Sequence, residues 1–306
     1  MTSPTAGEAA DGPVGDAPPT ERTPVLLIGL GTMGLPIALR LHAAGVPVWG
    51  MDRQPELHDA LPGGRVFTAG SVCDAVRACR AAAVITCVSD EAALQRLWQA
   101  PGGLHEALVP GLCVVDHTTT SVPAARQFAA DAGQAGAMWV DAPLSGAAAG
   151  ARAGTLSAML GGEPHAVDHA RPLLSAYCAT LTHLGPAGAG QAGKLTNQIA
   201  IAGINAGLLA ATGFAALQGL DLGRCFDAMT AGSAHSVQMA QHRAALTRAP
   251  ADSTLFDWLR RDLALVLEHL LVDEAAATRG APQALHDRLH ALNRMLFDGT
   301  AAPPLL

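Results

Sequence analysis

Lys194 is the residue of this sequence whose type and position best suit proton transfer. It is the only lysine among 19 basic residues. Arginine keeps its proton near neutral pH, whereas a partly buried ammonium can have a lowered pKa and exchange a proton. A Gly-rich run precedes Lys194 and an apolar stretch follows it, which predicts a loop and then a long helix with Lys194 in its first turn. The helix dipole would lower the pKa of an ammonium there.

Two amide side chains accompany this lysine. Asn197 and Gln198 follow Lys194 by three and four residues, so they share its helix face. A proton donor beside two amides suits a polar substrate. The alternative is a lysine at a solvated helix start, which residue spacing alone does not exclude.

A dinucleotide-binding pattern lies near the start of the chain. Residues 25–28 predict a buried strand, a helix runs to about residue 44, and a second strand, 46–51, ends at an acidic residue. Between the first strand and the helix stands a glycine motif, which allows a tight turn, a close approach to a pyrophosphate and close helix packing. We therefore assign cofactor binding to Gly29, Leu30, Gly31, Thr32, Met33 and Gly34. The alternative is a Gly-rich turn in another kind of α/β domain.

Asp52 and the next residue, Arg53, point to different cofactors. A carboxylate at the end of the second strand would bind the ribose hydroxyls of NAD and repel a 2′-phosphate. The adjacent arginine could accept that phosphate, which would suit NADP, or it could be a solvated loop residue. We expect NAD, with NADP as the open alternative.

Further strands are predicted at 82–88, 112–115, 137–140, 155–160 and 179–184, with a helix from about residue 164 between the last two. Strands that alternate with helices indicate an N-terminal Rossmann-type, doubly wound and mostly parallel sheet. Ligands bind beyond the carboxyl ends of such strands, which places Val88 and Thr119 with the cofactor. The threonine cluster around Thr119 could equally cap the next helix. After 137–140 comes a loop of small residues, where Ser145 and N–H groups near Gly146 could hold a carboxylate.

The second part of the chain is predicted to be all-helical. Residues 195–220 carry no charge, a length that could span a membrane, but polar residues interrupt the stretch, among them Asn197, Gln198, Asn205, Thr212 and Gln218. We therefore expect a helix buried in protein, with Gly203 and Gly207 allowing a second subunit or the next helix to approach. Further helices are expected at about 222–230, 235–247, 255–278 and 282–296. The predicted divisions are a disordered tail, 1–22, a cofactor-binding domain, 23–186, and a helical substrate and oligomerisation domain, 187–306.

Composition narrows the classes of partner. The formal charge of −7, without a basic run, argues against nucleic acid, and no membrane association is expected. Six cysteines without CxxC spacing indicate reduced thiols and a cytoplasmic protein. Two histidine pairs at helical spacing, His165/His169 and His286/His290, lack an evident carboxylate ligand, so no metal site is expected.

Four separated motifs resemble those of the β-hydroxyacid dehydrogenase family, which includes 3-hydroxyisobutyrate dehydrogenase and 2-hydroxy-3-oxopropionate reductase. They are residues 29–34, residues 141–146, Gly190 with Lys194, Asn197 and Gln198, and residues 257–263. The segment 231–239 also resembles one bacterial branch of the family. The resemblance covers about residues 24–300.

The resemblance implies an NAD(P)-dependent oxidoreductase of small β-hydroxy acids. The long uncharged helix needs more cover than one small helical domain gives, so we expect a homodimer or homotetramer. The resemblance makes Lys194 the catalytic acid/base, gives the substrate carboxylate to Ser145 and Gly146, and gives the reacting oxygen to Asn197 or Gln198. Thr119 would contact the nicotinamide. Two positions depart from the family pattern: Ala147 replaces a glycine, and Arg261, which we place with the cofactor, replaces a lysine.

Three alternatives remain on the same scaffold. Imine reductases usually lack the catalytic lysine, and the 6-phosphogluconate branch needs a phosphate site and a larger helical domain. A non-catalytic NAD(P)-binding protein could have lost its lysine, which this chain keeps.

Overall fold

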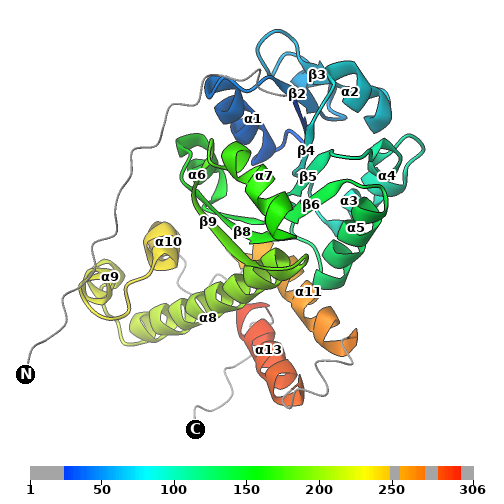
Figure 1. Cartoon of the computed structure of the whole chain (residues 1–306). Coiled ribbons are helices and arrows are strands. Elements are labelled where there is room, and N and C mark those ends of the chain that lie inside the picture. Colours follow the sequence, from blue (N-terminus) through cyan, green and yellow to red (C-terminus); the bar gives the residue numbers. More distant parts are fainter. Residues whose placement is uncertain (1–23, 249–255, 273–281, 298–306) are drawn as a thin grey trace, which may run out of the picture.

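The computed structural model describes residues 24–248, 256–272 and 282–297, so the predicted tail, 1–22, lies outside the described residues. Its centre is a nine-stranded sheet in the order β3-β2-β1-β4-β5-β6-β8-β7, with β9 paired to β8 (Figure 1). The strands are β1 Val25–Ile28, β2 Val48–Met51, β3 Val66–Phe67, β4 Ala83–Thr86, β5 Cys113–Asp116, β6 Met138–Asp141, β7 Leu144–Ser145, β8 Leu156–Gly161 and β9 Cys178–Gly185.

The sheet is mostly parallel, as predicted. Strands β1 to β6 all pair in parallel, while β8 runs antiparallel to β6 and β7 and parallel to β9. The carboxyl ends of β1, β2 and β4 therefore open at one edge, where a ligand can reach them. The short strands β3 and β7 were not predicted, because two residues are too few to show a periodic pattern.

Helices cover both faces of the sheet, and each face has its own apolar cluster. One face packs against α1 Gly34–Ala43, α6 Ala147–Ala153 and α7 Pro164–Leu174. The other packs against α2 Val72–Cys79, α3 Glu91–Gln99, α4 Leu104–Ala107 and α5 Val122–Gln134. The doubly wound arrangement predicted from the sequence is confirmed.

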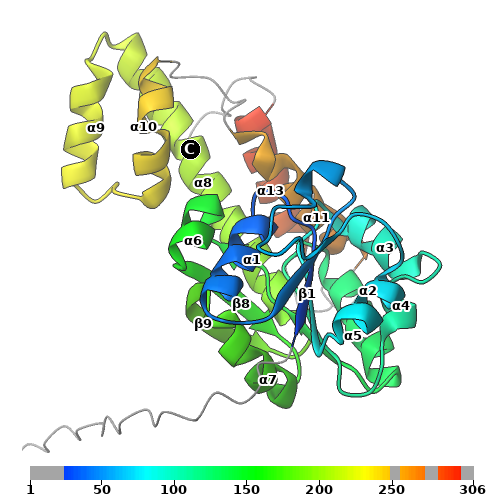
Figure 2. The same cartoon turned by 90° about the horizontal axis from the view of Figure 1, so that it is seen from above.

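The chain after the sheet is helical throughout its described residues. Its helices are α8 Ala189–Leu217, α9 Leu222–Ala231, α10 Val237–Arg248, α11 Trp258–Val272 and α13 Pro282–Phe297. Part of the predicted helix 255–278 lies outside the described residues. The long helix α8 runs from the sheet to α9 and α10, which lie at its far end, away from the sheet (Figure 2). A small cluster of Val122, Leu195, Val266 and Leu289 joins α5 to α8, α11 and α13.

The Gly-rich run before Lys194 is helical, so the predicted loop was wrong. Helix α8 begins at Ala189, and Lys194 is its sixth residue, in the second turn instead of the first. The cause lies in another part of the chain. The buried Asp141 carboxylate, at the end of β6, accepts hydrogen bonds from the backbone N–H groups of Gly188 (2.8 Å) and Gln191 (3.0 Å). A carboxylate at a helix N-terminus satisfies donors that have no partner within the helix.

The glycines of this run serve close packing between helix and sheet. A Cβ on Gly190 would lie 2.5 Å from the carbonyl oxygens of both Asp141 and Met159. A Cβ on Gly193 would lie 2.2 Å from the Cδ1 atom of Leu184. Helix α8 can therefore lie directly against β6, β8 and β9 only without side chains at these positions.

The segment after Asp141 is more ordered than the predicted loop of small residues. Ser145, in strand β7, pairs with Ser157 of β8, and the alanine-rich residues after Gly146 form helix α6. Alanine has the highest intrinsic helix propensity, which favours a helix here once Gly146 has reversed the chain. Ala147 adopts a positive φ of 51°, a left-handed conformation that glycine occupies without strain.

Helix α8 is only partly buried within the single chain, so its predicted burial in protein would need the second subunit that the prediction allowed for. Among the described residues it is the one helix long and apolar enough to cross a membrane, and 39% of its most apolar window is buried. The exposed residues lie toward its far end, where Phe214 is 64% and Leu217 is 81% exposed. The half nearer the sheet packs against β8, α11 and α13.

The close packing of Gly190 gives a stability prediction. We expect Gly190→Ala to destabilise the fold by about 1–3 kcal/mol, since the added methyl group overpacks against backbone oxygens that cannot move aside. Gly213→Ala, in the same helix, has open space around its Cβ position, and its higher helix propensity should stabilise the fold by up to about 1 kcal/mol. Urea unfolding of both variants measures the difference. Equal unfolding midpoints would contradict the packing argument.

Candidate active site

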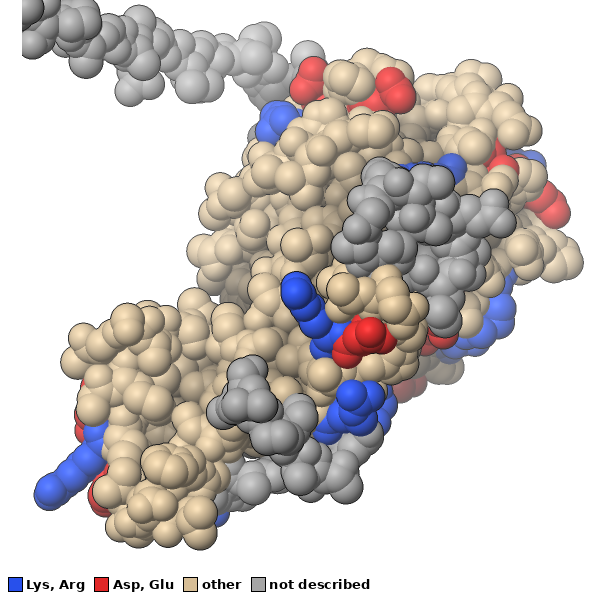
Figure 3. Space-filling model, turned by 90° about the horizontal axis from the view of Figure 1, so that it is seen from below, with Lys and Arg blue, Asp and Glu red and all other residues tan. Residues whose placement is uncertain are grey.

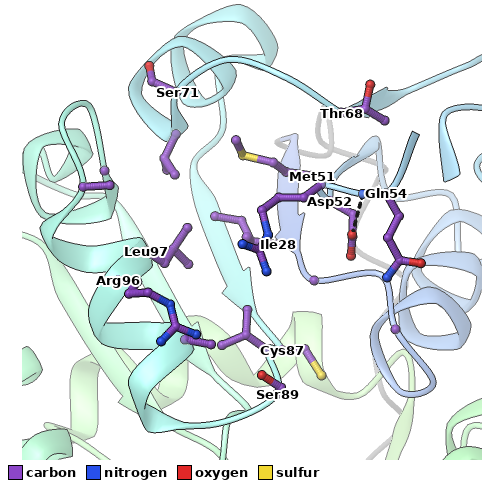
Figure 4. Close-up of a pocket in the computed structure, with 18 of the residues that line it drawn as sticks. Ile28, Met51, Asp52, Gln54, Thr68, Ser71, Cys87, Ser89, Arg96 and Leu97 are labelled. Atoms are coloured by element: carbon purple, nitrogen blue, oxygen red, sulfur yellow. Dashed lines mark hydrogen bonds between the residues drawn. The ribbon is translucent and has the colours of Figure 1, made fainter. Parts of the chain in front are cut away.

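A cavity of about 1140 Å³ opens at the carboxyl ends of β1, β2 and β4. Its walls come from the glycine motif, the ends of these strands, the segment 68–72 and helix α3 (Figure 4). The start of α11 also lines it. Of the predicted cofactor residues, those that line it are Gly29, Gly31, Thr32, Met33, Asp52, Arg53, Val88 and Arg261. The volume and the mixed lining fit a dinucleotide.

The three glycines of the motif have different surroundings. A Cβ on Gly29, whose φ is +94°, would lie 2.4 Å from the carbonyl oxygen of Cys87, and one on Gly34 would lie 1.8 Å from that of Gly29. Gly31 has nothing within 4 Å of the same position. The first and third glycines are therefore required by the fold itself, whereas Gly31 leaves space on the cavity side for a bound group to approach the backbone.

Asp52 is fixed at the edge of this cavity. Its Oδ2 atom accepts a hydrogen bond from the Leu30 backbone N–H at 2.7 Å, and its Oδ1 atom accepts one from Gln54 N–H at 3.1 Å. The side chain of Leu30 is buried in the core, so only the backbone of this residue takes part in the site. The neighbouring Arg53 is exposed and also lines the cavity.

The helical part of the chain supplies one wall of the cavity. Trp258 and Arg261, one turn apart on α11, both line it, and Trp258 is 46% exposed. The Arg261 Nη1 atom donates a hydrogen bond to the Ser89 carbonyl oxygen, and its Nε lies 3.7 Å from the Asp262 carboxylate. The site is therefore shared between the sheet domain and the helices.

Lys194 lies half-buried on α8. Burial lowers its pKa, and the nearby negative charge of Asp262 partly opposes this effect. Among the residues that the structure describes, the Lys194 ammonium has no hydrogen-bond or ion-pair partner. A lowered pKa makes a lysine exchange its proton more readily than an ordinary lysine, and the absence of a partner leaves the ammonium available to a bound group.

The two predicted amide side chains have different places. Gln198 is 2% exposed, and its Nε2 atom donates to the Asp262 carboxylate at 2.6 Å. Asn197 is half-buried, and its amide makes only a long contact of 3.4 Å to Gln198. Asn197 is thus the amide available to a substrate, while Gln198 holds Asp262 near Lys194.

The threonine cluster is tied to α8 by a residue that the sequence analysis did not select. The fully buried Gln191 accepts a hydrogen bond from Thr120 N–H at 3.1 Å and donates one to the Thr118 carbonyl at 2.7 Å. Thr119, between them, is half-buried and is not among the residues lining the cavity. Neither are Ser145 and Gly146, which lie at β7 and the start of α6, half-buried and exposed respectively.

Asp141 and Asp262 lie in motifs noted in the sequence, but no role was assigned to them, and Gln191 was not selected at all. Asp141 could have been found, because an acidic residue at the carboxyl end of a predicted strand is a candidate helix cap or ligand. Gln191 and Asp262 act through partners 64 to 73 residues away in the chain, which no local pattern reveals.

Comparison with known proteins agrees with this geometry. Residues 24–185 match the NAD binding domain of 6-phosphogluconate dehydrogenase, and residues 188–288 match the NAD-binding domain of NADP-dependent 3-hydroxyisobutyrate dehydrogenase. The chain belongs to the β-hydroxyacid dehydrogenase family. It is an NAD(P)-dependent hydroxyacid dehydrogenase, as the sequence resemblance implied.

Individual relatives cover most of this dehydrogenase. An uncharacterised oxidoreductase of Shewanella frigidimarina is 35% identical over 80% of this chain and 84% of its own length. The NAD-dependent L-serine dehydrogenase of Pseudomonas aeruginosa is 35% identical over 64% of this chain and 65% of its own length. The solved 3-hydroxyisobutyrate dehydrogenase of Mycobacterium tuberculosis with L-serine superposes with a TM-score of 0.70 at 26% identity, covering 91% of this chain and 99% of that one.

A buried polar network lies behind the site of this dehydrogenase. The fully buried ring of His117 bonds to the Ala142 carbonyl oxygen through Nδ1 (2.6 Å) and to the Tyr177 hydroxyl through Nε2 (2.8 Å). Burial lowers the pKa of His117 to about 4, so the ring is neutral, with Nδ1–H donating and Nε2 accepting. Burial also raises the pKa of the adjacent Asp116 to about 7, although hydrogen bonds from Thr86 and Thr118 oppose the shift.

The His117 pKa gives a prediction for stability against pH. The folded chain protonates this ring only near pH 4, and the unfolded chain near 6.5, so lowering the pH through this window favours unfolding. Asp116 acts in the opposite sense, because the folded chain binds its proton at higher pH than the unfolded chain. The difference in unfolding free energy between wild type and His117→Asn isolates the contribution of His117 to this pH dependence.

We expect the stability advantage of wild type over His117→Asn to shrink by about 3 kcal/mol between pH 6.5 and pH 4. Urea unfolding at several pH values measures it. An advantage that stays constant over this range would show that His117 is not held neutral by burial.

Proposed function

We propose that this dehydrogenase oxidises a small β-hydroxy acid of the 3-hydroxyisobutyrate type, or reduces the matching semialdehyde, with Lys194 as general acid/base. The observation that carries the proposal is the state of Lys194. The only lysine of the chain is half-buried, has a lowered pKa and has no partner among the described residues. A lysine with a purely structural role would have its ammonium paired or solvated.

The chemistry divides between cofactor and protein. When bound, the nicotinamide supplies or accepts the hydride. In the oxidation direction, neutral Lys194 takes the proton of the substrate hydroxyl. In reduction, its ammonium returns a proton to the carbonyl oxygen. Asp262, held by Gln198, sets the balance between these two states because its negative charge favours the ammonium.

The remaining polar groups are assigned to the substrate. Asn197 would orient the reacting oxygen, while Ser145 and the backbone at Gly146 would hold the carboxylate. Two relatives with stated activities are a 3-hydroxyisobutyrate dehydrogenase bound to L-serine and an L-serine dehydrogenase. Both 3-hydroxyisobutyrate and L-serine carry a hydroxyl group at the β-carbon of a carboxylic acid. Assaying a panel of 2- and 3-hydroxy acids by the absorbance of the reduced nicotinamide tests the proposal. Turnover confined to 2-hydroxy acids would refute it.

The first prediction here concerns Lys194. Lys194→Ala should lower kcat by about 10²–10⁴, the usual contribution of a positioned proton-transfer group, and leave NADH affinity nearly unchanged. Lys194→Arg should fail almost as badly, because a guanidinium keeps the charge without exchanging the proton. Steady-state kinetics and NADH titration separate the two effects. An arginine variant with more than about a tenth of wild-type kcat would refute the acid/base role.

The second prediction concerns the cofactor, for which we propose a preference for NAD. The Asp52 carboxylate is fixed by Leu30 N–H at the cavity edge, where it would repel a 2′-phosphate. Asp52→Asn should raise kcat/KM with NADP relative to NAD by about tenfold, with one unfavourable charge contact removed. Arg53→Gln is the control, and it should shift the ratio the other way if Arg53 accepts that phosphate. An unchanged ratio in Asp52→Asn would remove this residue from the ribose site.

The third prediction concerns assembly, which we propose to be at least dimeric. The far end of α8 exposes Phe214 and Leu217, and Val237 at the start of α10 is 67% exposed. The face in Figure 3 carries few charged side chains, and these are scattered among uncharged residues. Large exposed apolar residues of this kind indicate a protein interface. Light scattering should give a dimer or tetramer for wild type and a smaller species for Leu217→Glu. A monomeric wild-type protein at micromolar concentration with NADH present would refute assembly.

A further inference from the structure

We propose that Arg96 of helix α3, together with Arg261, binds the pyrophosphate of the dinucleotide from the cavity wall that faces the glycine motif. No motif in the sequence contains Arg96. The proposal rests on the proposed function, in which this cavity binds the cofactor. It adds Arg96, from the sheet domain, to Arg261, from helix α11, as a positively charged contact.

Position is the first argument. Arg96 lies on the face of α3 that lines the cavity, together with Ala93 and Leu97, three residues before and one residue after it. Figure 4 shows its guanidinium reaching into the cavity from the wall opposite Asp52 and Gln54. A side chain of this length could have turned outward into solvent, so its direction matters.

Lack of a partner is the second argument. Among the described residues, no carboxylate or other group forms a hydrogen bond or ion pair with Arg96, and its side chain is exposed. The positive charges of Arg96 and Arg261 both lower the pKa of Asp90, which places the two guanidinium groups around the same point. Asp90 itself accepts the helix-capping hydrogen bond of Ala93 N–H (2.8 Å) and one from the Ser89 hydroxyl (2.9 Å), so its oxygens are already engaged.

The charge of the cavity is the third argument. Its charged lining residues are Asp52, Arg53, Arg96 and Arg261, three positive groups against one negative. Asp52 and Arg53 lie together at the end of β2, the ribose end, which leaves Arg96 and Arg261 as the charged residues that line the rest of the cavity. Of these two, Arg261 also lies 3.7 Å from the Asp262 carboxylate, whereas Arg96 has no ion pair among the described residues. A guanidinium forms paired hydrogen bonds with phosphate oxygens, and the pyrophosphate carries two negative charges.

Arg96→Gln tests the assignment, with Arg77→Gln as the matched control. Arg77 is an exposed arginine of α2 that does not line the cavity and pairs with Asp74 at 4.0 Å. Fluorescence titration gives Kd for NADH and NADPH, and displacement of NADH gives Kd for ADP-ribose and adenosine. Thermal unfolding of each variant checks that the fold is retained.

We expect Arg96→Gln to weaken NADH, NADPH and ADP-ribose about tenfold each, as for loss of a charge-assisted phosphate contact, and adenosine by less than about twofold. Arg96→Lys should recover part of the loss, and Arg77→Gln should bind like wild type. Unchanged NADH affinity in Arg96→Gln would overturn the proposal. So would an equal loss for adenosine, which indicates a base contact, or a loss confined to NADPH, which indicates the 2′-phosphate. A wild-type protein that binds neither dinucleotide would refute the proposed function as well.

Discussion

The hydrogen bonds of the Asp141 carboxylate to the N-terminus of α8 are the interaction on which the site depends. They join the end of a central strand to a 29-residue helix whose N-cap, Gly188, stands 47 residues later in the chain. Burial raises the pKa of Asp141, and the backbone N–H groups of Gly188 and Gln191 oppose this by stabilising the carboxylate. Because a helix is rigid, fixing its first turn also fixes the position of Lys194 in the next turn.

Other contacts at the start of α8 extend this alignment to the rest of the site. Gln191 holds the loop that carries Thr119, and Gln198 holds Asp262 of α11 near Lys194. The same helix α11 brings Trp258 and Arg261 to the cofactor cavity. Lys194 and this wall of the cavity thus belong to neighbouring helices, α8 and α11, which are joined by the buried hydrogen bond between Gln198 and Asp262.

Burial has different consequences for the ionisable groups around this centre. It lowers the pKa of Lys194 and of His117, and it raises that of Asp116, because in each case the uncharged form is favoured away from water. His117 has both ring nitrogens bonded, and this suits a structural role behind the site. Among the described residues, Lys194 has no hydrogen-bond partner, which distinguishes it from His117 and supports the proposed proton transfer.

The sequence by itself determined the order of strands and helices and the dinucleotide motif, because these depend on local periodicity and glycine spacing. It also singled out Lys194 for the proposed proton transfer, through residue chemistry alone. Tertiary structure decided what distant partners impose. Asp141 turned the predicted loop before Lys194 into helix, and packing space explains why glycines stand at 190 and 193. The tertiary structure also joins Gln198 to Asp262 by a hydrogen bond and places Arg96 at the wall of the cavity. Such contacts join residues far apart in the chain, and so no local pattern contains them.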